Sequence, residues 1–175
     1  MPPAREAVDR LPIPLVKNAA YRLLHGVVIA VHNARNPKRE EWDIYLDMVR
    51  SLRVAFDGDC RKFKQLIFTD GGVPSAAQRK AVVDIATGLK DRDKVKVAIV
   101  SRSAVARGIV TAFRWIGFPL RSFAPNELAA AFAFLEVSKA ETQDLCAAIA
   151  DLCATIDGSV HSASRVEAYR ATLGG

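Results

Sequence analysis

Apolar residues recur along the chain in two patterns, one typical of strands and one typical of amphipathic helices. Two short β-rich runs, 21–25 and 27–32, flank Gly26 and predict an antiparallel hairpin. From residue 40 the apolar positions repeat at helical spacing and predict the first helix; they are Trp42, Tyr45, Leu46, Val49 and Leu52. The folded part of the chain is therefore expected to begin with a β-ribbon followed by a helix.

Three strand-and-helix pairs are predicted after this first helix. The strands cover 66–68, 95–100 and 120–123, and the helices that follow them cover 75–89, 105–116 and 128–135. Strands that alternate with helices are usually parallel, and each crossover then covers the sheet with a helix. We therefore expect an α/β fold with a mixed, mostly parallel sheet covered by helices.

The chain divides into three parts by composition. Residues 1–18 are rich in proline and read as an N-terminal tail, residues 19–137 form the α/β domain, and residues 138–175 form a C-terminal helical extension. Apolar residues recur at helical spacing from Leu145 to Ile156, and such a stripe must be buried somewhere. It could pack on the sheet or on a second copy of the chain, so a homodimer through this extension is one prediction.

Composition limits the class of protein and its partners. Half of the 175 residues are apolar and a quarter are charged, which is enough for one domain with a sizeable core. No apolar run approaches the roughly 18 residues of a membrane span, and the first residues lack the apolar segment of a secretory signal. We therefore expect a cytoplasmic protein with no membrane partner. The net charge of +6 is scattered over loops, which favours a solvated surface over a nucleic-acid interface.

Cysteines and histidines give no metal or disulfide pattern. The three cysteines, Cys60, Cys146 and Cys153, match neither a paired CxxC motif nor a disulfide framework, so reduced thiols are expected. Cys146 and Cys153 are seven residues apart and share a helix face, which predicts packing. The three histidines form no ligand set. No metal and no cofactor are predicted.

The most distinctive loop, Asp70 to Ser75, joins the 66–68 strand to its helix. Ser75 could cap that helix, or it could be a phosphorylation or ligand site, because a helix N-terminus holds phosphate well. Gly71 and Gly72 could let the backbone approach a ligand or could simply form the turn. Both interpretations stay open.

A second loop, Ser101-Arg102-Ser103, follows the next strand, and Arg107 lies one turn into the next helix. Because ligands of open α/β sheets bind at the carboxyl ends of strands, the two loops could form one shallow site for an anionic lipid or nucleotide. Helix capping by Ser103 and a solvated Arg102 are the structural alternatives. Neither a GxxxxGK[ST] loop nor a GxGxxG loop is present.

An enzyme is the remaining alternative. Asp70 at a strand end could serve as a general acid or base, but it would need a histidine such as His25 or His32, or another titrating group, in the same pocket. The sequence shows no such set, and no catalytic residue is predicted.

Local sequences along this order of elements resemble one bacterial family. They are Glu40-Glu41-Trp42, the stretch from Pro74 to Arg79, Ala106-Arg107-Gly108, and Phe123-Ala124 before Glu127-Leu128-Ala129. With the order of strands and helices, they are similar to the STAS domain, the fold of SpoIIAA-type anti-sigma-factor antagonists, and to its SpoIIAA-like group of unknown function. The resemblance covers about residues 20–137.

The resemblance implies a protein-interaction module that docks onto a protein partner. It also implies that this docking has a regulatory role. In the antagonists, a serine at the start of the helix after the central strand is phosphorylated, and Ser75 occupies the matching place. The antagonists carry an Asp-Ser-Ser-Gly type sequence there, whereas this chain has Val73-Pro74-Ser75-Ala76. The docking face expected from the resemblance is the loop 70–75 together with the helix 104–116.

Overall fold

A single five-stranded sheet forms the centre of the molecule. The structure is a computed structural model that describes residues 18–57, 59, 62–86, 94–103 and 119–174. The strands, in their order across the sheet, are β1 Ala19–Leu24, β2 Val27–His32, β3 Lys64–Thr69, β4 Lys96–Val100 and β5 Leu120–Phe123. Strand β1 is antiparallel to β2, and the other neighbours are parallel. The predicted α/β fold with a mixed, mostly parallel sheet is confirmed.

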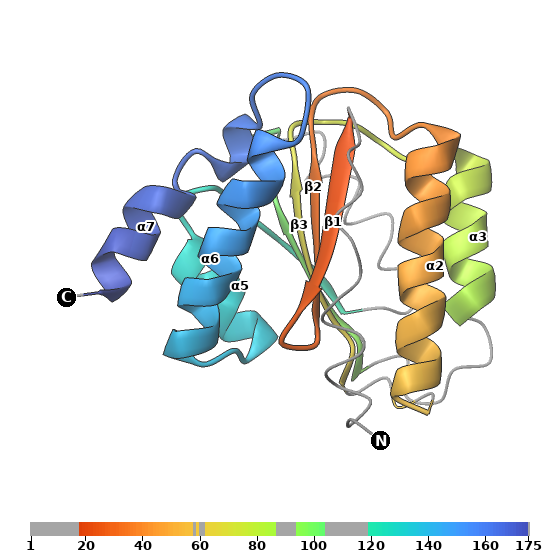
Figure 1. Cartoon of the computed structure of the whole chain (residues 1–175), viewed down its shortest axis with the longest axis horizontal. Coiled ribbons are helices and arrows are strands. Elements are labelled where there is room, and N and C mark those ends of the chain that lie inside the picture. Colours follow the sequence, from red (N-terminus) through yellow and green to blue (C-terminus); the bar gives the residue numbers. More distant parts are fainter. Residues whose placement is uncertain (1–17, 58, 60–61, 87–93, 104–118, 175) are drawn as a thin grey trace.

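Helices cover both faces of this sheet (Figure 1). Helices α2 Arg39–Ala55 and α3 Ala76–Ala86 lie on one face, and α5 Leu128–Leu135 and α6 Lys139–Ala154 lie on the other. A 3₁₀ turn, η4 His161–Ala163, and helix α7 Val166–Leu173 complete the described chain. The predicted helix at 105–116, the N-terminal tail and the end of the 75–89 helix lie outside the described residues.

The hairpin between β1 and β2 turns at His25 and Gly26. Both residues have positive φ angles, 52° and 73°. This is the conformation of the two-residue turn that matches the twist of antiparallel strands, and glycine adopts it without strain. The β-ribbon predicted around Gly26 is thus observed.

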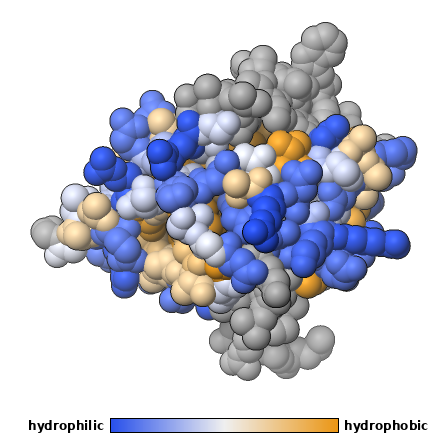
Figure 2. All heavy atoms as spheres, turned by 90° about the horizontal axis from the view of Figure 1, so that it is seen from above, coloured by the Kyte–Doolittle hydropathy of each residue, from blue (hydrophilic) through white to orange (hydrophobic). Residues whose placement is uncertain are grey.

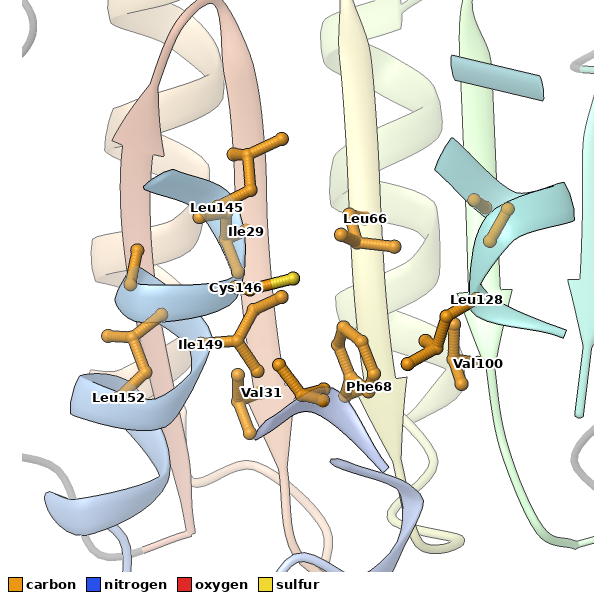
Figure 3. Packing of buried hydrophobic residues seen from close by; sticks show 14 of the residues in the cluster. Ile29, Val31, Leu66, Phe68, Val100, Leu128, Leu145, Cys146, Ile149 and Leu152 are labelled. Carbon is orange, nitrogen blue, oxygen red and sulfur yellow. The ribbon is translucent and has the colours of Figure 1, made fainter. Parts of the chain in front are cut away.

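Helix α6 packs on the same sheet as the rest of the domain. Its apolar stripe contains Leu145, Ile149 and Leu152, all fully buried. Figure 3 shows these side chains beside Ile29 and Val31 of β2. Ser138 begins the helix with a capping box, because its hydroxyl accepts the N–H of Glu141. The C-terminal segment therefore shares one core with the sheet, and the stripe that the sequence left without a packing partner is buried within the chain itself.

The opposite face of the sheet packs against α2. Trp42 lies in this core, as its position in the helical pattern predicts, and its indole N–H donates to the carbonyl of Gln78 at 3.1 Å. That bond joins α2 to α3. The hydroxyl of Tyr45 exchanges hydrogen bonds with the side chain of Gln65 on β3. Hydrogen-bonded polar side chains are therefore built into this layer.

No helix in the described parts of the chain is both long and apolar enough to cross a lipid bilayer.

Candidate functional site

Four loop segments meet at the carboxyl ends of the parallel strands. They are 33–36 after β2, 70–75 after β3, 101–103 after β4, and 157–162 around the start of η4, and we call them the edge loops. The hydroxyl of Ser101 donates to the carbonyl of Thr69 at 2.7 Å, so the start of the loop after β4 contacts the last residue of β3. From the sequence, the loops after β3 and β4 could form one shallow site for an anionic ligand.

Ser75 is the N-cap of helix α3. Its hydroxyl accepts the backbone N–H of Gln78 at 3.2 Å, while the Gln78 side chain accepts the N–H of Ser75 at 2.7 Å. This reciprocal pair is a capping box, and it satisfies two backbone donors that the helix cannot. The residue is exposed. The capping interpretation of Ser75 is therefore present in the structure, and its hydroxyl faces a surface that a partner can reach.

The backbone at Gly71 and at Gly72 adopts a conformation or a contact that disfavours a side chain. Gly71 has a φ of 126°, which side chains disfavour. A Cβ at Gly72 would lie 2.2 Å from the carbonyl oxygen of Arg35, and the Gly72 N–H donates to the carbonyl of Asn33. The sequence left open an approach to a ligand or a simple turn; the close approach observed is that of Gly72 to the neighbouring edge loop, while nothing lies within 4 Å of a Cβ at Gly71.

The carboxylate of Asp70 binds the C-terminal part of the chain. Its two oxygens accept the backbone N–H groups of His161 and Ser162, the latter at 2.6 Å. An aspartate in this position satisfies N–H groups at the start of the η4 turn, as an N-cap does at a helix. Sequence reasoning placed Asp70 in a ligand or docking loop but did not anticipate this contact.

Asn33 connects three of the segments. It is buried, and its side-chain amide donates to the carbonyl of Asp157 at 3.0 Å while its side-chain oxygen accepts the N–H of Arg35 at 2.8 Å. Its backbone carbonyl accepts from Gly72. Sequence reasoning missed this residue, although asparagine directly after a strand is a common turn former.

The loop after β4 is anchored through its first serine. Ser101 is fully buried, and its hydroxyl oxygen accepts the N–H of Ser103 at 3.1 Å. Arg102 is exposed at the rim of the edge loops. Arg107, the other arginine proposed for an anion, lies outside the described residues.

Figure 2 looks onto this end of the molecule from above. Hydrophilic residues predominate on the face, with paler and apolar residues between them. The exposed residues of the edge loops are mostly polar, among them Arg35, Asn36, Ser75, Arg102 and His161.

The three histidines lie in different parts of the structure, and only His161 is in contact with the Asp70 carboxylate, through its backbone. His25 lies in the hairpin turn, at the opposite end of the strands, where its Nε2 is 2.8 Å from the carboxylate of Asp144. His32 packs on the α2 side of the sheet against Tyr21, and burial lowers its pKa to about 4. His161 lies near Asp70 through its backbone, while its Nε2 is 3.0 Å from the hydroxyl of Ser159. Neither His25 nor His32, the two histidines that the enzyme hypothesis named, places its side chain beside the Asp70 carboxylate.

The described cysteines are buried or half-buried thiols. Cys146 and Cys153 are both free, and burial raises the pKa of each thiol to about 11. A thiol with so high a pKa is a poor nucleophile at neutral pH. Their shared face of α6 is packed, as their spacing predicts. In the part of the chain that the structure covers, no group of three or more His, Cys, Asp or Glu side chains could hold a metal ion.

Comparisons with protein-family models, with curated proteins and with solved structures found no match to the chain. The fold and the edge loops together define an α/β domain with interlocked loops at one end of its sheet.

Proposed function

We propose that the protein is a non-catalytic, STAS-like interaction module that docks onto a partner protein through its edge loops. The observation that carries the proposal is the exposed hydroxyl of Ser75 at the start of α3, at the place where the resemblance puts the regulatory serine. A charge added at this point would change the docking surface directly.

The fixed shape of the edge loops supports this proposal. Hydrogen bonds tie the loops to one another through Asp70, Asn33 and Ser101. A surface that is already ordered loses little conformational entropy when a partner binds, so more of the contact energy appears as affinity. The Asp70 carboxylate and the Ser101 hydroxyl already form hydrogen bonds that hold the loops together. This arrangement favours a role in binding a partner over a role in catalysis.

Phosphorylation of Ser75 is compatible with the local structure. A phosphate at a helix N-terminus accepts hydrogen bonds from free backbone N–H groups and interacts favourably with the helix dipole. The Arg79 guanidinium lies on the first turn of α3, where it donates to the carbonyl of Pro74 at 2.6 Å. The modification would therefore preserve the helix while adding about two negative charges to the edge.

Two substitutions at Ser75 separate charge from capping. Asparagine and aspartate are both good N-caps, and only aspartate adds a charge. The full-length chain with Ser75, Ser75→Asn or Ser75→Asp would be used for affinity capture from an extract of the cells that produce it. We expect one protein to be retained equally by the wild type and Ser75→Asn, and its amount to change at least tenfold with Ser75→Asp.

A charge placed elsewhere gives the control. Ser51 is exposed on α2, far along that helix from the edge loops, so Ser51→Asp should retain the same protein as the wild type. Mass spectrometry of the purified native protein would show whether Ser75 carries phosphate. Equal capture by all four chains, with Ser75 unmodified, would overturn the regulatory role. Absence of any specifically retained protein would overturn the interaction module itself.

A further inference from the structure

The layer between the sheet and α2 contains two buried polar side chains that the proposed function does not use. His32 on β2 and Tyr21 on β1 are 5% and 1% exposed, and their rings meet edge to face with centroids 5.8 Å apart. Among the described residues, neither ring nitrogen of His32 has a hydrogen-bond partner, and nor has the hydroxyl of Tyr21. Buried polar atoms are nearly always paired in proteins, so this contact needs a physical explanation.

The neighbouring polar groups are already satisfied by other partners. The Tyr45 ring lies 5.4 Å from that of Tyr21, but its hydroxyl is bonded to Gln65. Glu41 is also buried, and its two carboxylate oxygens accept the N–H groups of Asn18 at 3.1 Å and Lys38 at 2.9 Å. Neither residue forms a hydrogen bond with the Tyr21 hydroxyl or the His32 ring. Within the described residues, Tyr21 and His32 are thus left without a hydrogen-bonded neighbour, and the buried side-chain oxygen of Asn18, directly before β1, is also unpaired there.

We propose that one water molecule binds between His32 and Tyr21 beneath helix α2. A neutral imidazole offers one donor and one acceptor, and a tyrosine hydroxyl offers both. Water can donate to one of these groups while it accepts from the other, which is how buried polar groups without a direct partner are usually satisfied. The low pKa of His32, caused by burial, keeps the ring in this neutral form at pH 7.

Other ligands fit this site less well. A bound anion would lie close to the buried Glu41 carboxylate; burial above all, then Tyr45 and then Glu41, already raise the pKa of Tyr21 and so disfavour negative charge here. A metal ion would find His32 without the additional His, Cys, Asp or Glu ligands that it needs, since the described residues form no such group. The surrounding core of Ala19, Val28 and Ala30 is fully buried, which suits a small neutral molecule.

The hydration site would lie directly below the edge loops. His32 is the last residue of β2 and lies beside Thr69 of β3, whose hydroxyl donates to the carbonyl of Gly72. The inference stands on the buried contacts alone and does not depend on what the edge loops bind.

Removal of the Tyr21 hydroxyl distinguishes a hydroxyl that is bonded to water from one that has no hydrogen-bond partner. Chemical denaturation of the full chain would be compared for the wild type, Tyr21→Phe and Tyr45→Phe. If water joins the pair, Tyr21→Phe lowers the folding equilibrium constant about fivefold, as expected for the loss of a net hydrogen bond. Tyr45→Phe is the matched control, because the hydroxyl that it removes has a partner, and it should also reduce stability. An increase in stability for Tyr21→Phe would show that the hydroxyl is unpaired and would overturn the proposal.

Two further experiments test the proposed water: the energetic coupling between Tyr21 and His32, and a crystal structure. Once either side chain loses its polar atoms the water loses a partner, so the double variant Tyr21→Phe/His32→Phe should lose less stability than the sum of the single variants. A high-resolution crystal structure should show one ordered water within hydrogen-bond distance of Tyr21 Oη and a ring nitrogen of His32. Additive single effects, or a direct bond between the two side chains in the crystal, would contradict the inference.

Discussion

The Asp70 carboxylate accepts the backbone N–H of Ser162 at 2.6 Å, although 92 positions separate the two residues in the chain. This bond, together with the one to His161, holds the turn after α6 against the end of β3. The C-terminal segment is thereby part of the same edge as the loop that carries Ser75. Any partner that reaches this end of the sheet meets both parts of the chain together.

Replacement of Asp70 by asparagine should loosen the C-terminal turn. The amide keeps the shape of the side chain but has one acceptor oxygen in place of two. It can therefore accept only one of the two N–H groups, turns its own NH2 donor toward the other, and lacks the negative charge that strengthens these bonds. We expect the free energy of unfolding to fall by about 1–3 kcal/mol. Amide hydrogen exchange at residues 161–166 should become faster. Asp84→Asn removes an exposed ion pair with Lys80 and should change stability by less than about 0.5 kcal/mol. Equal effects of the two substitutions would show that Asp70 does not anchor the turn.

Substitution of Ser75 should lower stability only where the new side chain cannot cap helix α3. Ser75→Ala removes the acceptor for the Gln78 N–H and should lower the free energy of unfolding by about 1 kcal/mol. Ser75→Asn should stay within a few tenths of a kcal/mol of the wild type, because asparagine caps equally well. Urea denaturation of the two variants measures the difference. Identical midpoints for alanine and asparagine would rule out a capping role.

Gly72 should tolerate no side chain. The methyl group of Gly72→Ala would collide with the backbone carbonyl of Arg35, and backbone cannot move aside as a flexible side chain can. We expect a loss of about 1–3 kcal/mol, in the range of overpacked sites. Gly174→Ala is the control, since the nearest atom to its Cβ would be 4.0 Å away. Thermal melts of both variants test this, and a Gly72→Ala protein as stable as the wild type would show that the two loops are farther apart.

His32 should make stability depend on pH below neutrality. Burial lowers its pKa from 6.5 to about 4, so between these values the unfolded chain binds more protons than the folded one. The contribution is complete above pH 6.5 and is lost as the pH falls toward 4, to a maximum of about 3 kcal/mol.

Denaturant midpoints at several pH values between 7 and 4.5 would measure this loss. His32→Gln should show a flatter profile over that range. His161→Gln changes an exposed ring and should keep the slope of the wild type. The same slope in His32→Gln and the wild type would assign the pH dependence to other groups.

Local patterns in the sequence predicted most of the strands and helices. Periodic apolar residues define α2 and the hairpin, because the side-chain period of each element is a property of a few consecutive residues. Capping by Ser75 was one of the two interpretations drawn from the sequence. Gln78, three residues later, is the residue that completes a capping box.

Contacts between distant segments could not be predicted in the same way. The stripe of α6 was visible in the sequence, but nothing local showed that it would pack on β2. The bond from Asp70 to Ser162 and the contact between Tyr21 and His32 depend on the arrangement of loops and on strand register, which a single sequence does not state. The candidate site is therefore understood mainly from the fold.

Hydrogen exchange of the free protein and of its complex with the captured partner tests the docking proposal most directly. If the edge loops are the docking surface, amides at 33–36, 70–75 and 101–103 should exchange more slowly in the complex, because partner contact excludes water from them. The hairpin turn at His25 and Gly26 lies at the opposite end of the strands and should exchange at an unchanged rate. Protection confined to that end, with the edge loops unchanged, would contradict the account.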